Sequence, residues 1–251
     1  MTLEEFFAAH PKLALAFSGG VDSSYLLYAA VKCGADVGVY YVKSQFQPEF
    51  ELRDALELAD RLGVRVRLIR QDILSCPDVT VNPPDRCYYC KKHIMGAVKA
   101  QSRADGYDLI IDGTNASDDI SDRPGYRALG EEGILSPLRI CGLTKPEIRR
   151  LSEEAGLPTW NKPAYACLAT RIAAGEPITA EKLEAAEAGE NFLFSLGFTD
   201  FRVRVHGRNA LLQFTAEQHE RARALFPETE KALSVYFDSV TLDPVIREKS
   251  L

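Results

Sequence analysis

The sequence predicts an α/β protein with a doubly wound parallel sheet and a second, smaller α+β domain. Up to residue 69, short apolar runs alternate with segments of helical periodicity, and the joins between them are short. A glycine turn connects the first apolar run to the first helix, as in ligand-binding α/β sheets. Beyond residue 171 the pattern changes to a long helix and a period-two hairpin. We therefore expect residues 1–171 to form the first domain and residues 172–251 the second.

The first domain is expected to alternate strands with helices. The run Val37–Val42 is apolar and β-rich, as in a strand buried in a parallel sheet. In Glu49–Leu62 the apolar residues recur at helical spacing, and Gly63 ends the segment. By the same criteria we expect helices at 3–10 and 21–33 and strands at 12–17 and 64–69.

The rest of the chain departs from this regular alternation. Residues 76–89 hold three prolines and are expected to form a loop. Thr144 and Glu147 have the spacing of a capping box, which predicts a helix at 144–155. Periodicity predicts the remaining elements, which are helices at 91–104, 179–196 and 216–225, a strand at 109–111, and a hairpin of 201–205 with 211–214.

Composition argues against several classes of protein. The formal net charge of −6 argues against a broad nucleic-acid footprint, which would make the chain basic. No apolar run approaches the roughly eighteen residues that a membrane-spanning helix needs. The first five residues lack the positive charge of a signal peptide. We expect a cytoplasmic protein whose six cysteines are reduced and serve as ligands, catalysts or core side chains.

The glycine turn has the chemistry of an anion site. After the first strand the chain reads Ser18-Gly19-Gly20-Val21-Asp22-Ser23-Ser24 and begins a helix. Backbone N–H groups point outward at a helix N-terminus, glycines let a ligand approach the main chain, and the helix dipole favours negative charge. The serine hydroxyls add donors, and Asp22 can cap the helix or hold Mg²⁺ on a phosphate. Neither the lysine of a kinase-type P-loop nor the glycine spacing of a dinucleotide fold is present.

A second polar segment is expected at the same edge of the sheet. Asp112, Gly113, Thr114 and Asn115 leave the carboxyl end of the strand at 109–111. Ligands of doubly wound sheets bind outside the carboxyl ends of the strands, where the glycine turn also lies. The sequence therefore assigns both segments to one ligand-binding edge.

The pair Cys87-x-x-Cys90 and the distant Cys167 have three interpretations. A structural role, as buried small side chains, is expected for the other three cysteines, which are Cys33, Cys76 and Cys141. As a zinc site, the pair and Cys167 would be joined by His93 in a closed set of three cysteines and one histidine. As ligands of a [4Fe–4S] cluster, the three cysteines would leave one iron open to bind sulfide or substrate. The C-x-x-C is expected in a loop that opens onto a helix, where thiolates are stabilised, and its spacing fits zinc and cluster equally well.

Two arginines alternate in the strand expected at 201–205. Arg202 and Arg204 should share one face of that strand, because successive strand residues point in opposite directions. Such a pair can bind a substrate phosphate through bidentate hydrogen bonds. A solvated strand face would have the same pattern, and the residues alone leave both interpretations open.

Several separated motifs resemble those of a known family. Ser18–Ser24 resembles the PP-loop of the ATP pyrophosphatase superfamily, whose members split ATP between the α- and β-phosphates and adenylate a carboxylate or carbonyl oxygen. Four further motifs resemble those of the LarE family of PP-loop sulfur transferases, namely Asp112–Asn115, Arg123–Gly125, Ser136–Leu138 and Lys162–Arg171. The resemblance runs from Phe17 to Arg204, which is most of the chain.

The resemblance implies a Rossmann-like fold and an AMP-forming, ATP-dependent sulfur transferase of nickel-pincer nucleotide biosynthesis. In that family a carboxylate of pyridinium-3,5-biscarboxylic acid mononucleotide is adenylated and converted to a thiocarboxylate. Cys167 matches the cysteine that gives up its own sulfur in one branch, and the extra C-x-x-C matches the branch that carries sulfide on a three-cysteine [4Fe–4S] cluster. The implied cofactors are ATP, Mg²⁺ and this cluster. The implied partners are the pyridinium mononucleotide, a sulfur donor and further copies of the chain.

The resemblance also implies roles for individual residues. The catalytic residues would be Cys87 and Cys90 with Cys167, all three on the cluster, and Asp22 on Mg²⁺. The nucleotide would be bound by Ser18, Gly19, Gly20, Val21, Asp22, Ser23, Ser24, Asp112, Gly113 and Thr114. The substrate would be bound by Arg123, Arg171, Arg202 and Arg204. Glu190 resembles the family's acidic residue on the long helix, whereas Gln213 stands where a further acidic residue is expected, which puts a metal site at that pair in doubt.

Two alternatives stand beside this interpretation. A tRNA thiolase of the same superfamily would also combine a C-x-x-C with a cluster, although this acidic sequence lacks the basic face that tRNA binding needs. An adenine-nucleotide-binding scaffold with a structural zinc would use the same cysteines without catalysis. Iron, sulfide and thiolation of the pyridinium mononucleotide would distinguish the first interpretation from both.

Overall fold

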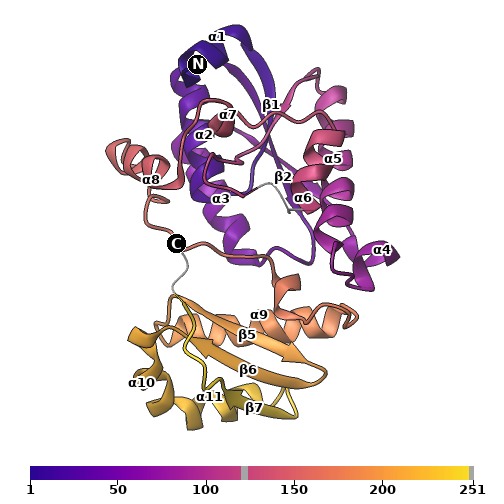
Figure 1. Cartoon of the computed structure of the whole chain (residues 1–251), viewed down its shortest axis with the longest axis vertical. Helices are drawn as coiled ribbons and strands as arrows, with labels where there is room; N and C mark the ends of the chain where they lie inside the picture. The colour runs from indigo at the N-terminus through magenta and orange to yellow at the C-terminus, as the bar shows by residue number, and fades with distance from the viewer. Residues whose placement is uncertain (120–123, 249–251) are drawn as a thin grey trace. The chain divides into compact units, whose positions relative to one another are not determined.

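The computed structural model describes residues 1–119 and 124–248, which form two compact units (Figure 1). The first unit contains Met1–Ile73 and Asp85–Lys162, and the second contains Leu74–Pro84 and the chain from Pro163 onward. Arg123, one of the four arginines expected to bind the substrate, lies outside the described residues. In the part of the chain that is described, no helix has the length and apolar character needed to cross a membrane.

The first unit is built on a four-stranded parallel sheet in the order β3-β2-β1-β4. Its strands are β1 (Lys12–Ala16), β2 (Asp36–Lys43), β3 (Val66–Arg70) and β4 (Ile110–Ile111). β1 lies in the middle of the sheet, since it pairs with β2 along its whole length and with β4 through Ala14 and Leu15. The expected α/β fold with a parallel sheet is confirmed.

Helices cover both faces of this sheet, which is the doubly wound arrangement (Figure 1). Leu15 and Tyr41 belong to an apolar cluster with α1, α2 and α3. Their strand neighbours Tyr40 and Val42 point the other way and pack with α5 and α6. The helices of this unit are α1 (Leu3–Ala9), α2 (Val21–Lys32), α3 (Glu49–Arg61), α5 (Arg86–Ala104), α6 (Pro124–Glu131), α7 (Pro137–Ile140) and α8 (Lys145–Glu154).

The capping box expected before α8 is confirmed. The backbone N–H of Thr144 donates to Glu147 Oε2 at 2.9 Å, and the side chain of Thr144 accepts from the N–H of the same glutamate. Two backbone groups left open at the start of a helix are satisfied in this way, so α8 begins at Lys145.

The C-x-x-C lies in a helix, and the expectation of a loop through residue 89 is wrong. α5 begins at Arg86, with Asp85 as its N-cap, so Cys87 and Cys90 fall in its first two turns. Pro83 and Pro84 come directly before this start, where a missing N–H and a fixed φ are tolerated. The prolines therefore mark the beginning of the helix. A one-turn helix, α4 (Pro77–Thr80), also replaces part of the expected loop.

The second unit contains a mixed three-stranded sheet in the order β5-β6-β7. The expected hairpin is confirmed: its two strands are antiparallel, and their register runs from Phe201 opposite Phe214 to His206 opposite Asn209. The third strand pairs in parallel with β6 and was not anticipated. The elements are η2 (Leu168–Arg171), α9 (Ala180–Ser195), β5 (Phe201–His206), β6 (Asn209–Phe214), α10 (Ala216–Ala224), α11 (Phe226–Leu233) and β7 (Ser239–Leu242).

Two segments that precede residue 172 belong to the second unit. The side-chain amide of Asn82 donates to the carbonyl oxygens of Ala173 at 2.7 Å and Glu176 at 2.9 Å. The N–H of Ile178 donates to the carbonyl oxygen of Thr80 at 2.9 Å. These bonds tie the proline-rich segment to chain that follows residue 171. The second unit thus includes residues 74–84 and begins again at Pro163, whereas the sequence places the boundary at residue 171. Sequence periodicity does not reveal bonds between distant segments.

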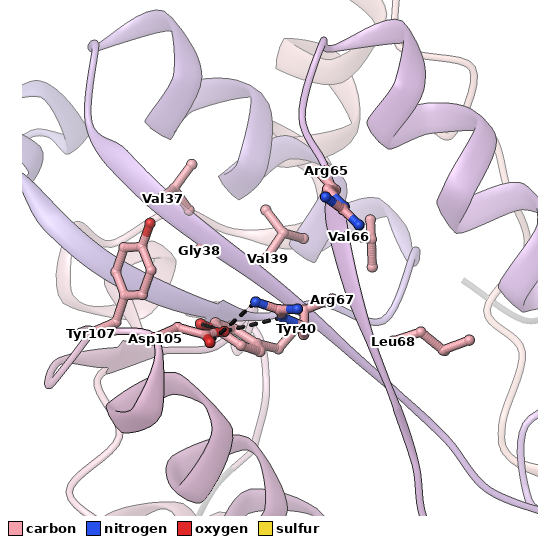
Figure 2. Close-up of a pocket in the computed structure, with 10 residues that line it drawn as sticks. All are labelled: Val37, Gly38, Val39, Tyr40, Arg65, Val66, Arg67, Leu68, Asp105 and Tyr107. Carbon is pink, nitrogen blue, oxygen red and sulfur yellow. Dashed lines mark hydrogen bonds and ion pairs between the residues drawn. The ribbon is translucent and has the colours of Figure 1, made fainter.

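A trough of about 690 Å³ lies along the amino-terminal halves of β2 and β3 (Figure 2). Arg67 donates from Nε and Nη2 to the carboxylate of Asp105 at 3.2 and 3.1 Å, and the Tyr40 hydroxyl donates to the same carboxylate at 2.9 Å. In Figure 2, Tyr107 lies to the left of Asp105 and Arg67 to its right. Ligands of doubly wound sheets bind at the opposite, carboxyl ends of the strands. The trough is therefore distant in the fold from the edge to which the sequence assigns the site.

Candidate active site

The turn after β1 is fixed by close packing against α3. Gly19 has a φ of +74°, a left-handed conformation that glycine adopts without strain. A Cβ atom at this position would lie 2.7 Å from Cβ of Ala55 in α3. Gly20 is the N-cap of α2, so the first N–H groups of that helix lack intrahelical partners. Position 19 requires glycine for two reasons, and the turn presents a helix terminus suited to anions.

The hydroxyls of Ser18 and Ser23 form hydrogen bonds within the turn. Ser18 Oγ and Ser23 Oγ are 3.0 Å apart, and Ser23 Oγ donates to the carbonyl oxygen of Gly20 at 3.2 Å. Ser24 is fully buried, and its hydroxyl makes no hydrogen bond to any described residue. Ser18 is exposed, so its hydroxyl is the one that a ligand at this edge can reach.

Asp22 pairs with a lysine that the sequence analysis did not assign to the site. Lys145 Nζ lies 2.7 Å from Asp22 Oδ2. Burial raises the pKa of the Asp22 carboxyl above its usual value, and Lys145 opposes this rise without cancelling it. The second oxygen, Oδ1, is buried and has no donor within hydrogen-bond distance in the described part of the chain, although the side chain of Asn115 lies close enough to lower the pKa of the carboxyl. The capping box, which makes Lys145 the first residue of α8, was the available sequence signal for this lysine.

The Asp22 carboxylate fits a divalent cation. Mg²⁺ takes oxygen ligands, keeps several waters, and is commonly bound through one or two carboxylates and substrate phosphates. Oδ1 is a carboxylate oxygen without a donor from the described residues, one residue into the helix whose N-terminus suits phosphate. Asp22 therefore has the chemistry to hold Mg²⁺ beside a bound phosphate.

The segment after β4 packs directly on the start of α2. A Cβ atom at Gly113 would lie 2.9 Å from the backbone nitrogen of Ser23, so this approach requires glycine. Asp112 is 6% exposed and accepts from Ser136 Oγ at 2.6 Å and from Thr114 Oγ1 at 2.7 Å. The two segments that the sequence assigns to one edge are thus in contact. Ser136 fixes the buried carboxylate between them.

A depression of about 410 Å³ lies at the carboxyl ends of β2 and β3. Its lining is polar, and Gln45 Nε2 donates across it to Asp72 Oδ1 at 2.8 Å. These residues form no recognisable motif, because polar residues after a strand are common. The lining residues are Lys43, Ser44, Gln45, Arg70, Gln71 and Asp72.

Cys87 and Cys90 lie one turn apart near the N-terminus of α5. Residues three apart on a helix share one face. A short connection joins the C-terminus of α5 to the start of β4, so the N-terminus of this long helix lies toward the carboxyl edge of the sheet. Cys87 is exposed and Cys90 half-buried, and Arg86 Nη2 lies 3.8 Å from Cys87 Sγ. Two cysteine sulfurs one helical turn apart can bind the same zinc ion or iron–sulfur cluster.

Cys167 lies in the second unit, where arginines of β5 hold the chain around it. Cys167 is half-buried and is the N-cap of η2. Arg202 Nη2 donates to the carbonyl oxygen of Ala164 at 3.0 Å, and Arg204 Nη1 donates to the carbonyl oxygen of Thr170. Burial lowers the pKa of both guanidinium groups, that of Arg202 to about 10, with other arginines nearby adding to the shift.

Glu190 and Gln213 both bond to protein groups of the second unit. Glu190 is 1% exposed, and its Oε1 accepts from Arg171 Nε at 2.6 Å. Gln213 accepts from Arg204 Nε at 2.8 Å and donates to Asp243 Oδ2 at 2.7 Å. The amide of Gln213 thus joins a guanidinium to a carboxylate, in the position where the family pattern has an acidic residue.

The structure divides the expected site residues between the two units. The glycine turn and the segment after β4 come together in the first unit, which also holds Cys87 and Cys90. The second unit holds Cys167 with Arg171, Arg202 and Arg204 around its segment. The set of three cysteines as ligands of one cluster stays a prediction.

The fold and the edge built from the glycine turn and Gly113 are those of PP-loop ATP pyrophosphatases. The chain is 33% identical to the pyridinium-3,5-bisthiocarboxylic acid mononucleotide synthase of Lactiplantibacillus plantarum over 204 residues. The aligned region covers 80% of this chain and 74% of that protein. The chain belongs to the LarE family of PP-loop ATP pyrophosphatases.

Two further comparisons extend this relationship. The chain is 36% identical to an uncharacterized protein of Synechocystis over 218 residues, and the aligned region covers 86% of this chain and 81% of that protein. It is 27% identical to a tRNA-specific 2-thiouridylase of Thermotoga over 194 residues, covering 58% of this chain and 52% of that protein. No family model matches the chain.

Proposed function

We propose that this protein is an ATP-dependent, AMP-forming sulfur transferase that converts a carboxylate of pyridinium-3,5-biscarboxylic acid mononucleotide to a thiocarboxylate. The observation that carries the proposal is the glycine turn with Asp22, Lys145 and Gly113 around it, in a chain 33% identical to the bisthiocarboxylic acid synthase. By family resemblance, the product would serve nickel-pincer nucleotide biosynthesis, and the protein would work as a homo-oligomer with a separate sulfur donor.

The first half-reaction activates the carboxylate. A carboxylate is a poor electrophile, and transfer of AMP to its oxygen creates a leaving group and releases pyrophosphate. The N–H groups at the start of α2 and the exposed Ser18 hydroxyl would bind the phosphates. Asp22 would hold Mg²⁺ through Oδ1, which supplies positive charge at the phosphates. Lys145, 2.7 Å from Asp22, would stabilise the negative charge that develops on pyrophosphate.

The second half-reaction replaces AMP with sulfur. We assign Cys87, Cys90 and Cys167 as the ligands of a [4Fe–4S] cluster, a proposal supported by the position of the C-x-x-C at a helix N-terminus. A cluster with three cysteine ligands has one iron without a protein ligand, which provides a place for sulfide. The chain itself supplies the sulfur ligands, and Arg86 Nη2 lies 3.8 Å from Cys87 Sγ.

The phosphate of the substrate is assigned to Arg202 and Arg204. A guanidinium has five N–H groups, and among the described residues Arg204 donates from Nε and Nη1 only. Its Nη2 can therefore donate to a substrate phosphate. Arg123 joins this assignment by family resemblance. Arg171 is fully buried, which makes it unsuited to contact a substrate phosphate directly.

Oxygen-free purification tests the proposal. The protein should contain iron and sulfide, should release AMP when ATP and the pyridinium mononucleotide are added together, and should yield a thiocarboxylate that mass spectrometry detects. Serine in place of Cys87, Cys90 or Cys167 should remove the iron. Cys33 is exposed, so the expectation that it is buried is wrong, and Cys33→Ser, which changes a thiol outside the ligand set, should keep the iron. A colourless zinc protein, or AMP release without a thiolated product, would contradict the proposal.

A second candidate function is tRNA thiolation, favoured by the 27% identity to a tRNA-specific 2-thiouridylase. The net charge of −6 weighs against it, because tRNA binding normally uses a basic surface. AMP release that depends on tRNA and not on the mononucleotide would select this candidate. Zinc with ATP binding and no turnover would select a nucleotide-binding scaffold.

A further inference from the structure

Arg171 is fully buried and bonds on both sides of Cys167. Its side chain is 0% exposed. Nη1 donates to the carbonyl oxygen of Ala166 at 3.0 Å and to Thr170 Oγ1 at 2.8 Å. Thr170 Oγ1 in turn donates to the carbonyl oxygen of Cys167 at 2.8 Å. The Arg171 guanidinium therefore binds the carbonyl oxygen of Ala166 directly and the carbonyl oxygen of Cys167 through the hydroxyl of Thr170.

Glu190 fixes the position of this guanidinium. Its Oε1 accepts from Arg171 Nε at 2.6 Å and its Oε2 accepts from Nη2 at 3.0 Å. Two parallel bonds set the plane of a guanidinium as well as its place. Oε1 also accepts from the backbone N–H of Val203 in β5 at 3.1 Å, and the Tyr165 hydroxyl donates to Oε2. Because Glu190 belongs to α9, the cysteine segment is tied through Arg171 to a helix and a strand.

A contribution to the free energy of unfolding does not by itself explain the buried ion pair of Arg171 and Glu190. Burying two charges carries a desolvation cost, and apolar side chains of the same volume often give an equally stable fold. The pair provides something that apolar side chains cannot, which is N–H groups directed at the carbonyl oxygen of Ala166 and at the hydroxyl of Thr170, on either side of Cys167. This contact pattern indicates a role in placing the cysteine.

We propose that Arg171, fixed by Glu190, is a positioning residue that holds the Cys167 thiol in one place for its reaction. The inference rests on the proposed function only in taking Cys167 as a reacting or ligating sulfur. Arg171 acts through the backbone of the cysteine segment. When the guanidinium or the Thr170 hydroxyl is removed, that segment loses bonds beside Cys167 and the thiol becomes more accessible.

Alkylation of Cys167 by iodoacetamide, read by peptide mass spectrometry, measures this effect without ATP or substrate. The readout is the alkylation rate of Cys167 divided by that of the exposed Cys33 in the same sample. Rates are compared at high pH, where both thiols are fully ionised, so that a change in thiol pKa does not alter the ratio. In Thr170→Val and in Arg171→Lys the ratio should rise about tenfold, the lower end of the effect of removing groups that orient a ligand. Thr170→Ser keeps the hydroxyl and should restore the wild-type ratio.

Matched substitutions separate positioning from loss of stability. Thr229 in α11 also donates its hydroxyl to a carbonyl oxygen, that of Leu225 at 3.0 Å, so Thr229→Val removes the same kind of bond elsewhere in the unit. Arg221→Lys removes a guanidinium that donates to the carbonyl oxygen of Leu196. Neither control should change the Cys167 ratio, even where the melting temperature falls as far as in the test variants.

The outcome of this assay is independent of turnover. A Cys167 ratio that stays within about twofold of wild type in both Thr170→Val and Arg171→Lys, well below the effect of an orienting group, would overturn the inference. An equal rise in Thr229→Val would overturn it as well. Absence of sulfur transferase activity would count against the proposed function, while the alkylation ratios would still decide whether Arg171 positions Cys167.

Discussion

The contact between Gly113 and the start of α2 gives a prediction whose size follows from the structure. A Cβ atom at position 113 would lie 2.9 Å from the nitrogen and 3.1 Å from the Cα atom of Ser23. Both are backbone atoms, so no side-chain rotation relieves the overlap. Ordinary contact begins at 3.4 Å, so Gly113→Ala must move the segment after β4 or the start of α2 by about 0.5 Å.

This displacement should be visible in both stability and catalysis. Forcing one extra carbon into a packed site costs about 1–3 kcal/mol, so the free energy of unfolding should fall by that amount. For a domain of this size the melting temperature should fall by about 2–12 °C. The N–H groups that would bind phosphate move with Ser23, and AMP formation at subsaturating ATP should fall about tenfold, since small misplacements of binding groups are costly.

Gly96→Ala is the matched control for this substitution. Gly96 lies in α5, and a Cβ atom there would meet nothing within 4 Å. Alanine loses less backbone entropy than glycine in a helix, so this variant should be more stable by about 0.5–1 kcal/mol and fully active. Thermal unfolding and AMP release measure both variants. If Gly113→Ala melted and released AMP as wild type does, the argument that Ser23 demands glycine at position 113 would be refuted.

Three further predictions concern the titrating groups and the thiols. Asp22→Asn should abolish AMP release, yet at about pH 7 the ATP-free variant should melt no lower than wild type. Burial raises the pKa of the Asp22 carboxyl in the folded protein, so protonation of this carboxyl stabilises the fold fully below its unfolded pKa of about 3.9. This stabilisation is lost as the pH rises through the pKa of the folded protein. Melting curves at about pH 4 and pH 7 check the sign, since wild type should gain on the variant only at the lower pH. Lys145→Met removes a charge that would stabilise pyrophosphate and that opposes the rise in the Asp22 pKa, so AMP release should fall at all pH values, and the remainder should be lost at a higher pH on acidification than in wild type. Lys182→Met, which breaks an ion pair in the second unit, should leave this pH profile unchanged. Cys90→Ser should lower bound iron under oxygen-free conditions, and equal iron in Cys90→Ser and wild type would remove Cys90 from the ligand set.

The C-x-x-C illustrates where local patterns mislead. Pro83 and Pro84 favour irregular chain, and the residues that follow are moderate helix formers, so a loop was the reasonable expectation. Proline is equally suited to the chain just before a helix, and the side chains of α5 pack on the sheet farther along, at Met95 and Val98. Prolines fit both a loop and the chain before a helix, so the local sequence left the choice open, and tertiary packing of the helix body decided it.

The alternation of strands and helices, the glycine turn, the capping box of α8 and the hairpin were all determined by the sequence alone. Each depends on periodicity, on a glycine conformation or on a cap, and these act over a few neighbouring residues. Only the tertiary structure decided which polar side chains meet, such as Lys145 with Asp22, Ser136 with Asp112 and Arg171 with Glu190. Such pairs form only when the intervening elements have packed, and the same residue types occupy many solvated positions, so no local pattern marks them.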